Sequence, residues 1–441
     1  MKRLFCILSA VVITFSFSGC SDSGSPADPP SGFTAEAKGG MVKVTWTPSP
    51  GVEYWLFTAT DPSLTAFNFT GLSDVNIFTP AATPFYFCGL NNGTPYYFAI
   101  NGRTNNGPGG ASSSTLSATP YDTSTAWAAG STVAPLPNLL GVGYTSLTTC
   151  SNNANSAAGS FAAVGAAGAL FTSEDGISWV NRTTPAAFTS DLFAVAGNAA
   201  NPINPALRWV AVGAGGASLY SSDGINWLVG RADLGNPSLR SLTQVSGTYY
   251  AAGDGGTIVT STDGVTWTTA TSNTTNNLNG ISYGTSFLAV GDSGTILTSI
   301  DGVTWTIVTA VTPATTATKA NLRHAISIGT IRVAVGEAGT IVTSVDSGAT
   351  WTTTTLAGKP NLVSVAAKTH LVANAVADPL LGFISNAQIV AIDSAGNTYT
   401  STNDLTTWLL NPTVMASATA LVSSGFGYVA TGNAGNTASA F

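Results

Sequence analysis

The sequence predicts an all-β protein made of a small sandwich followed by a larger array of repeated sheets. Only 8% of its 441 residues are charged, whereas 44% are hydrophobic and glycine contributes 48 residues. Helices need charged side chains on their exposed faces, while short strands can expose Thr, Ser and Asn and end in glycine turns. The net charge of −7 offers no basic surface for phosphates, so we expect no nucleic-acid partner.

Residues 1–20 are expected to be an export signal. Two basic residues precede an apolar stretch, Leu4–Phe17, that is too short to span a bilayer comfortably. The stretch ends in Phe17-Ser18-Gly19-Cys20, which resembles the bacterial lipobox, with Phe17 in place of the usual Leu. The resemblance implies that Cys20 is acylated, becomes the mature N-terminus and anchors an exported protein at the outer membrane or cell surface. An ordinary signal peptide with a chance cysteine is the alternative.

Residues 21–30 are rich in Ser, Pro and Asp and predict a flexible tether. No later stretch is apolar enough to cross a bilayer, so the lipid is expected to be the only membrane attachment.

Residues 31–119 are expected to form the sandwich. The stretches Val42–Trp46 and Glu53–Thr58 alternate with the period of two that marks half-buried strands. Leu90 and Tyr96 flank an Asn/Gly turn before a further alternating stretch. The combination is similar to the fibronectin type III domain, which implies that Trp46 is the core tryptophan and that Leu90 and Tyr96 form a tyrosine corner. We assign no chemistry to this domain.

From residue 160 the chain repeats a unit of two apolar strands followed by Ser-x-Asp-Gly-x-x-Trp. The motif has four regular copies and two longer or degenerate ones, and its aspartates are Asp175, Asp223, Asp263, Asp301, Asp346 and Asp404. The copies resemble the Asp-box, or BNR repeat, of sialidase-like and photosystem II assembly-factor-like β-propellers. The resemblance implies that the Asp caps the turn between a blade's third and fourth strands and that the Trp packs between blades. These aspartates are therefore expected to be structural.

The hairpin that precedes each motif predicts the number of blades. Its turn glycine recurs seven times, at Gly168, Gly216, Gly256, Gly294, Gly339, Gly396 and Gly435. Six motifs and seven hairpins leave the last blade one strand short. The segment Ser124–Gly130, preceded by an Asp at the same distance from a Trp as in the fifth motif, is expected to supply that outer strand. Residues 120–441 are thus expected to form a seven-bladed β-propeller closed by an N-terminal strand.

Two further cysteines, Cys88 and Cys150, predict a disulfide. Cys88 is expected at the end of the sandwich from which its last strand leaves, and Cys150 in a loop of the first blade on the Asp-box face. Both are therefore expected near the domain junction, and an exported protein meets an oxidising compartment. Two unpaired thiols are the alternative.

Four successive blades are expected to place an acidic residue on one rim. At the residue taken to follow the end of the second strand, these blades carry Asp254, Asp292, Glu337 and Asp393. Such an arc could hold a divalent cation or a basic ligand. Idle, solvated turn residues are the alternative, since Asp is common in tight turns. No other cofactor is expected.

Non-catalytic binding is the function that the sequence favours. We expect a scaffold lipoprotein that presents one propeller face to a protein or polysaccharide of the envelope or the extracellular space. A sialidase-like glycoside hydrolase or lyase is the second hypothesis. A purely structural or adhesive surface element is the third.

The sequence gives enzyme chemistry little support. We expect the outward face of the propeller to be the one opposite the Asp-boxes, built from the turns between second and third strands and the connections between blades. No arginine triad is evident there, since Arg208 and Arg332 are expected at the starts of second strands, away from this face. Arg182, Arg231 and Arg323 could reach the connections between blades on this face. His324 and His370 are expected in different blades and lack metal-ligand spacing.

Overall fold

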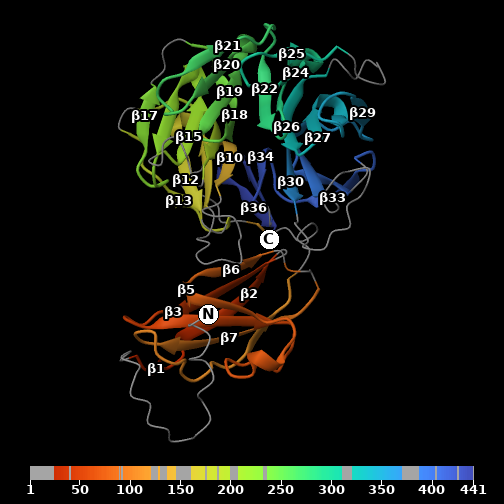
Figure 1. The fold of residues 1–441 in the computed structure, drawn as a ribbon. Coiled ribbons are helices and arrows are strands. Elements are labelled where there is room, and N and C mark those ends of the chain that lie inside the picture. Colours follow the sequence, from red (N-terminus) through yellow and green to blue (C-terminus); the bar gives the residue numbers. More distant parts are fainter. Residues whose placement is uncertain are drawn as a thin grey trace, which may run out of the picture. The chain divides into compact units, whose positions relative to one another are not determined.

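The computed structural model divides into two units, both built from β-strands (Figure 1). It describes residues 24–38, 41–88, 90, 93–120, 128–129, 137–145, 160–173, 176–185, 188–198, 207–231, 236–309, 320–369, 387–402, 405–424 and 427–440. The helices in these ranges are short 3-10 turns, and none of them is long and apolar enough to cross a membrane.

The first unit contains two sheets that share one core. One sheet is made of β2 (Ser31–Lys38), β3 (Met41–Thr47) and β6 (Phe85–Cys88). The other has the order β5 (Asn76–Ala81), β4 (Glu53–Ala59) and β7 (Tyr96–Arg103), with β8 (Leu116–Ala118) and β1 (Pro26–Ala27) both paired to β7. Alternate residues of β3, β4 and β7 meet around Trp46, which is 5% exposed, and Leu90 and Tyr96 pack against this core. Trp46 therefore lies in the core, as the sequence analysis expects, and Leu90 and Tyr96 contact that core.

The sandwich begins earlier than the sequence predicts. Strand β1 lies inside the expected tether, yet Pro26 pairs with Arg103 of β7. Just before it, the carbonyl of Ser25 accepts a hydrogen bond of 2.9 Å from the N–H of Thr104. A proline lacks an N–H and is tolerated at the edge of a sheet. Residues 25–27 therefore extend the sandwich and are not part of a flexible tether.

The second unit contains seven four-stranded antiparallel sheets in the described ranges, which follow one another along the chain. The first four are β10 (Leu139–Thr145), β11 (Ser160–Gly165), β12 (Leu170–Ser173) and β13 (Val180–Asn181); β14 (Leu192–Gly197), β15 (Trp209–Gly213), β16 (Ser218–Ser221) and β17 (Leu228–Arg231); β18 (Leu239–Val245), β19 (Thr248–Gly253), β20 (Ile258–Ser261) and β21 (Thr268–Ala270); and β22 (Leu278–Tyr283), β23 (Phe287–Gly291), β24 (Ile296–Ser299) and β25 (Thr306–Ile307). The others are β26 (Leu322–Ile328), β27 (Ile331–Gly336), β28 (Thr340–Ser344) and β29 (Thr352–Thr355); β30 (Leu362–Thr369), β31 (Ala387–Asp393), β32 (Asn397–Thr402) and β33 (Leu409–Thr413); and β34 (Ala418–Ser423), β35 (Tyr428–Gly432), β36 (Thr437–Ala440) and β9 (Ala128–Ala129).

The first strands of these sheets close into a ring. Each contacts the first strand of the next sheet, from β10 through β14, β18, β22, β26 and β30 to β34, and β34 contacts β10 again. In Figure 1 these strands lie toward the middle of the unit, while outer strands such as β17, β21 and β29 lie at its periphery.

The predicted closing strand is confirmed where the structure describes it. Ala129 pairs with Ala438, and Ala128 pairs with Ser439, so that β9 is the outer strand of the seventh sheet. The other residues of Ser124–Gly130 lie outside the described ranges.

Second strands are buried because a neighbouring sheet covers each of their faces. Strands β15, β23 and β27 are buried along their whole length. Arg332 on β27 is 0% exposed and joins the fourth and fifth sheets. Its guanidinium donates hydrogen bonds to Gly329 O (2.8 Å) within its own sheet and to Thr285 Oγ1 (3.0 Å) and Ser286 Oγ (2.9 Å) of the preceding one.

A polar residue immediately before each first strand holds neighbouring sheets together. Its carbonyl accepts a hydrogen bond from the turn between the second and third strands of its own sheet. In six of the seven sheets its side chain also accepts one from the corresponding turn of the preceding sheet. These residues are Asn138, Asp191, Ser238, Asn277, Asn321, Asn361 and, through its carbonyl only, Ser417. The bond of 3.2 Å from the N–H of Ala434 to Asn138 Oδ1 joins the seventh sheet to the first.

The same junction explains the glycine that ends most second strands. A Cβ at Gly291 would lie 1.9 Å from the carbonyl oxygen of Asn277, and one at Gly253 would lie 1.9 Å from that of Ser238. The φ of Gly291 is −165°, an extended conformation open to any residue. Close approach of the neighbouring carbonyl, and not backbone freedom, therefore requires glycine here.

Candidate functional site

A β-bulge follows the first residue of every first strand in the ring. The bulged residue has no pairing partner in the register and lies directly after the residue that pairs with the end of the second strand. The seven bulged residues are Leu140, Phe193, Arg240, Asn279, Arg323, Val363 and Thr419. Bulges redirect side chains and are common beside functional sites.

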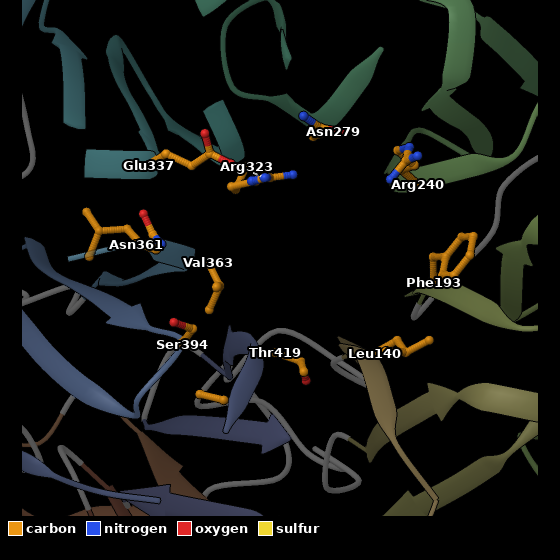
Figure 2. Close-up of a pocket in the computed structure, with 12 residues that line it drawn as sticks. Leu140, Phe193, Arg240, Asn279, Arg323, Glu337, Asn361, Val363, Ser394 and Thr419 are labelled. Carbon is orange, nitrogen blue, oxygen red and sulfur yellow. Dashed lines mark hydrogen bonds and ion pairs between the residues drawn. The ribbon is translucent and has the colours of Figure 1, made fainter. Parts of the chain in front are cut away.

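All seven bulged side chains line one pocket of about 500 Å³ (Figure 2). The remaining lining residues are Glu337, Asn361, Leu362, Ser394 and Ala418. Because every sheet of the ring contributes one bulged residue, the pocket lies on the axis of the ring. We call it the central pocket.

The central pocket has a polar arc and an apolar arc. The third, fourth and fifth sheets contribute Arg240, Asn279 and Arg323, which form the polar arc. The other arc comes from the sixth, seventh, first and second sheets, whose bulged residues are Val363, Thr419, Leu140 and Phe193. We call it the apolar arc because three of these four side chains are apolar. This asymmetry arises from seven equivalent positions of one repeat.

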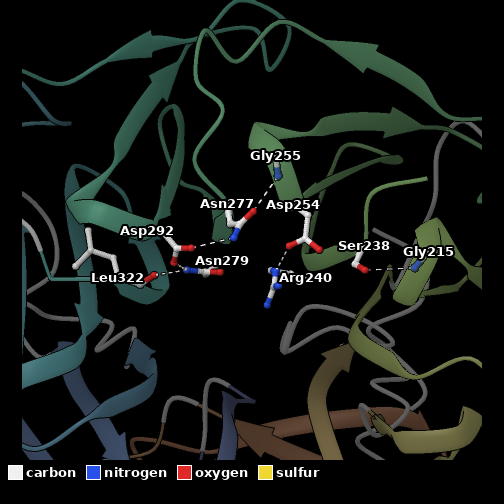
Figure 3. Close-up of polar contacts among 9 residues, drawn as sticks. All are labelled: Gly215, Ser238, Arg240, Asp254, Gly255, Asn277, Asn279, Asp292 and Leu322. Carbon is white, nitrogen blue, oxygen red and sulfur yellow. Dashed lines mark hydrogen bonds and ion pairs between the residues drawn. The ribbon is translucent and has the colours of Figure 1, made fainter. Parts of the chain in front are cut away.

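Each arginine of the polar arc is paired with the rim carboxylate of its own sheet. Arg240 Nε contacts Asp254 Oδ1 (Figure 3), and Arg323 Nη2 contacts Glu337 Oε1. The arginine side chains are 40% and 41% exposed, and both carboxylates are 33% exposed. Ion pairs this exposed contribute at most about 1 kcal/mol, so a ligand can displace them.

Asp292, the rim carboxylate of the fourth sheet, accepts hydrogen bonds from two amides. Its Oδ1 lies 2.9 Å from Asn279 Nδ2, and its Oδ2 lies 3.0 Å from Asn277 Nδ2 (Figure 3). Asn279 also donates to the carbonyl of Leu322 in the next sheet, at 2.9 Å. The bulged residue of the fourth sheet is thereby held in place.

Asp393 was predicted on the acidic rim, and the strand register shows that this prediction is wrong. Leu362 pairs with Asp393 as Leu322 pairs with Gly336, so Asp393 occupies the glycine position and Ser394 occupies the rim. Asp393 is 4% exposed, and its carboxylate accepts hydrogen bonds from its own turn and from the Tyr399 hydroxyl at 3.0 Å. Burial, with the hydrogen bond and charge of Asp393, raises the pKa of Tyr399 to about 12. The rim therefore carries three of the four expected carboxylates.

The three rim carboxylates do not gather around a common point. Within the described ranges, no group of three or more His, Cys, Asp or Glu side chains is arranged to hold a metal ion. One oxygen of Asp254 and one of Glu337 contact arginines, and both oxygens of Asp292 accept hydrogen bonds from amides.

The other residues singled out by sequence are scattered. Arg208 and Arg332 lie at the starts of β15 and β27, as expected, and of the three outward arginines only Arg323 lines the central pocket. His324 Nδ1 lies 3.1 Å from the carbonyl of Val365 in the next sheet, and burial lowers the pKa of His324 to about 4. His324 is thus a neutral link between two sheets at neutral pH.

Several expectations fall outside the described residues. These are Cys20, Asp175, His370, Asp404 and Cys150, the last of them with the predicted disulfide to Cys88.

The four described copies of the Asp-containing repeat motif share one hydrogen-bonding pattern, around Asp223, Asp263, Asp301 and Asp346. In the fourth sheet, Asp301 Oδ1 accepts hydrogen bonds from the N–H groups of Val303 (2.9 Å) and Thr304 (2.8 Å). The Ser299 hydroxyl donates to the same carboxylate at 2.9 Å, and Trp305, 1% exposed, donates from Nε1 to Gly302 O at 3.1 Å. The carboxylate is engaged by its own turn, as a structural role requires.

Comparison with solved structures identifies the fold of the larger part of the chain. The chain is similar to the structure titled "YCF48 bound to D1 peptide", with a TM-score of 0.53 and 14% identity over 71% of this chain and 96% of that one. It is also similar to the WD40 β-propeller domain of Doa1 (TM-score 0.50, 11% identity, 71% and 96% coverage) and to YCF48 from Cyanidioschyzon merolae (0.49, 15%, 71% and 98%). No protein-family model and no curated protein matches the chain. At these identities the likeness shows the fold alone, and that fold is a β-propeller.

The variant Asp301→Asn tests the structural role of this carboxylate through the pH dependence of stability. The N–H groups of Thr304 and Val303 and the hydroxyl of Ser299 lower the pKa of Asp301 from 3.8 to about 2. A carboxyl whose pKa is lowered on folding contributes stability that is present above the unfolded pKa, near pH 4, and lost as the pH falls toward 2. By calorimetry, we expect the melting temperature of the wild type to fall over this interval and that of the variant to fall less steeply. Equal slopes in the two proteins would contradict this role.

Proposed function

We propose that this chain is a non-catalytic binding protein that offers the central pocket of a seven-bladed propeller to a protein partner at the cell envelope. The observation that carries the proposal is the ring of bulged residues, since all seven sheets direct a side chain into one pocket. The seven four-stranded sheets correspond to the seven blades. The repeated sheets provide one frame, and the bulged residue that lines the pocket varies from sheet to sheet, as a specific binding site requires.

The lining of the central pocket favours binding over catalysis. Among the residues that line it, Glu337 is the only carboxylate, and it is paired with Arg323. Glycoside hydrolysis ordinarily needs two carboxyl groups on opposite sides of the scissile bond. YCF48, a protein of similar fold, is bound to a D1 peptide in its solved structure, which supports a protein partner as the ligand.

We infer that the first unit acts as a spacer domain. Its three-stranded and larger sheets around the buried Trp46 are consistent with the fibronectin type III domain that the sequence resembles. We assign it no ligand.

Export and lipid attachment through Cys20 complete the proposal and rest on the sequence of residues 1–20. Cells that produce the protein are expected to incorporate labelled palmitate into the wild type but not into Cys20→Ala. Palmitate labelling of the variant would contradict this anchor.

Photo-crosslinking in the producing cells tests the binding face. The full-length protein is made with p-benzoylphenylalanine in place of Phe193, which replaces one aromatic side chain of the pocket by another. We expect a discrete adduct with a protein partner, visible as a band of higher mass and identifiable by mass spectrometry. The matched control carries the same group at Val303, an Asp-box turn residue that is 56% exposed.

The two positions separate the possible outcomes. An adduct from position 193 alone supports the central pocket. Adducts from Val303 alone, or none from either position, would overturn the proposed function.

A further inference from the structure

We propose that the central pocket recognises a peptide segment in which an acidic side chain stands next to an aliphatic or aromatic one. This inference rests on the proposed function and adds the chemistry of the ligand. It follows from the polar arc, from the apolar arc and from which charged side chains line the pocket.

The charges that face the pocket favour an anion. Arg240 and Arg323 both line it, whereas Asp254 and Asp292 do not. The two arginines therefore face the ligand, and the acids of the third and fourth sheets lie behind the bulged residues on the turn. Glu337 is the single acid in the lining, so the charged lining side chains carry a net charge of +1, from two arginines and one glutamate. A guanidinium binds a carboxylate through two parallel hydrogen bonds, which favours a ligand carboxylate.

A ligand carboxylate can replace a rim acid at its arginine with little change in free energy. A ligand carboxylate that replaces Asp254 or Glu337 at an arginine exchanges one carboxylate for another. The displaced rim acid is 33% exposed and can be hydrated where it stands. The rim acids therefore compete with the ligand, and their removal is expected to strengthen binding.

The apolar arc sets the second requirement. Leu140 and Phe193, of the neighbouring first and second sheets, offer no hydrogen-bond donor or acceptor in their side chains, and the Thr419 hydroxyl beside them already donates to the carbonyls of Leu139 and Thr431. The polar lining residues Asn361 and Ser394 come from the sixth sheet, so the part of the arc formed by Leu140 and Phe193 suits an apolar group better than sugar hydroxyls. Phe193 belongs to the sheet next to that of Arg240, which places apolar surface beside a guanidinium (Figure 2). A volume of about 500 Å³ admits a few side chains of a segment but not a folded domain.

Peptide selection tests this inference. A display library of random decapeptides is panned on the immobilised full-length wild type, on Arg240→Ala/Arg323→Ala and on Asp254→Asn/Glu337→Gln. Arg182→Ala is the matched control, because Arg182 Nε donates to Thr172 Oγ1 (2.6 Å) and Arg182 does not line the pocket. We expect the wild type and the control to enrich peptides with Asp or Glu beside Leu, Ile, Val or Phe.

The affinity of a synthetic peptide of the enriched sequence is then measured for each protein. Loss of both arginines is expected to weaken binding by about tenfold or more. Removal of the two rim charges is expected to tighten it by roughly two- to fivefold, since exposed ion pairs are weak. Circular dichroism confirms that each variant is folded.

Three outcomes would overturn the inference. They are enrichment of basic or uncharged peptides, binding unaffected by loss of the arginines, and weaker binding without the rim charges, which would indicate a basic ligand held by the acidic rim. If the enriched peptides have another chemistry but lose binding in Phe193→Ala, the proposed function stands and only the ligand class fails. If no peptide depends on any pocket residue, both fail.

Discussion

The second unit depends on the way in which each sheet is hydrogen-bonded to the next. A single polar residue before each first strand joins two turns, one through its carbonyl and, in six sheets, another through its side chain. Asn138 makes the same connection between the last sheet and the first, so the ring closes through the same kind of hydrogen bond that joins the other sheets. Glycine at the end of the second strand allows the carbonyl to approach, and the bulge that follows turns the next side chain toward the axis.

This connection explains how a chain of similar repeats obtains a specific pocket. The bulged residue stands two positions after the polar residue that is hydrogen-bonded to two sheets, so its backbone is fixed even where its side chain is long. Substitutions at seven equivalent positions can then change the ligand without changing the frame. Here they place Arg240 across the pocket from Val363 and Arg323 across the pocket from Leu140, and the Asp and Glu of the rim become partners of the arginines (Figure 2). The acidic rim and the arginines of the central pocket are therefore parts of one arrangement.

Much of the frame could be predicted from the sequence, whereas the pocket could not. Regular motifs and turn glycines indicated the repeated sheets. The excess of seven hairpins over six motifs indicated a closing strand, part of which the structure describes at Ala128–Ala129. The bulges were missed because an unpaired residue becomes visible only when both strands are aligned. Asp393 was misplaced by one residue for the same reason, since it stands where the other sheets have glycine. In six of the seven sheets an Asn, Asp or Ser precedes a Leu, and the residue after that Leu varies from sheet to sheet. This recurring pattern is the signal that could have located the pocket.

Hydrogen exchange at the ring closure tests the central claim most directly. Native-state exchange is measured by NMR or mass spectrometry on the full chain as wild type, as Asn138→Ala and as Asn411→Ala. The last is the control, because the side-chain amide of Asn411 donates a hydrogen bond to Thr400 Oγ1 within one sheet. The account predicts faster exchange of the Ala434 amide and of β36 in Asn138→Ala, with little change there in the control. Equal protection of Ala434 in all three proteins would show that the side chain of Asn138 does not hold the ring closed.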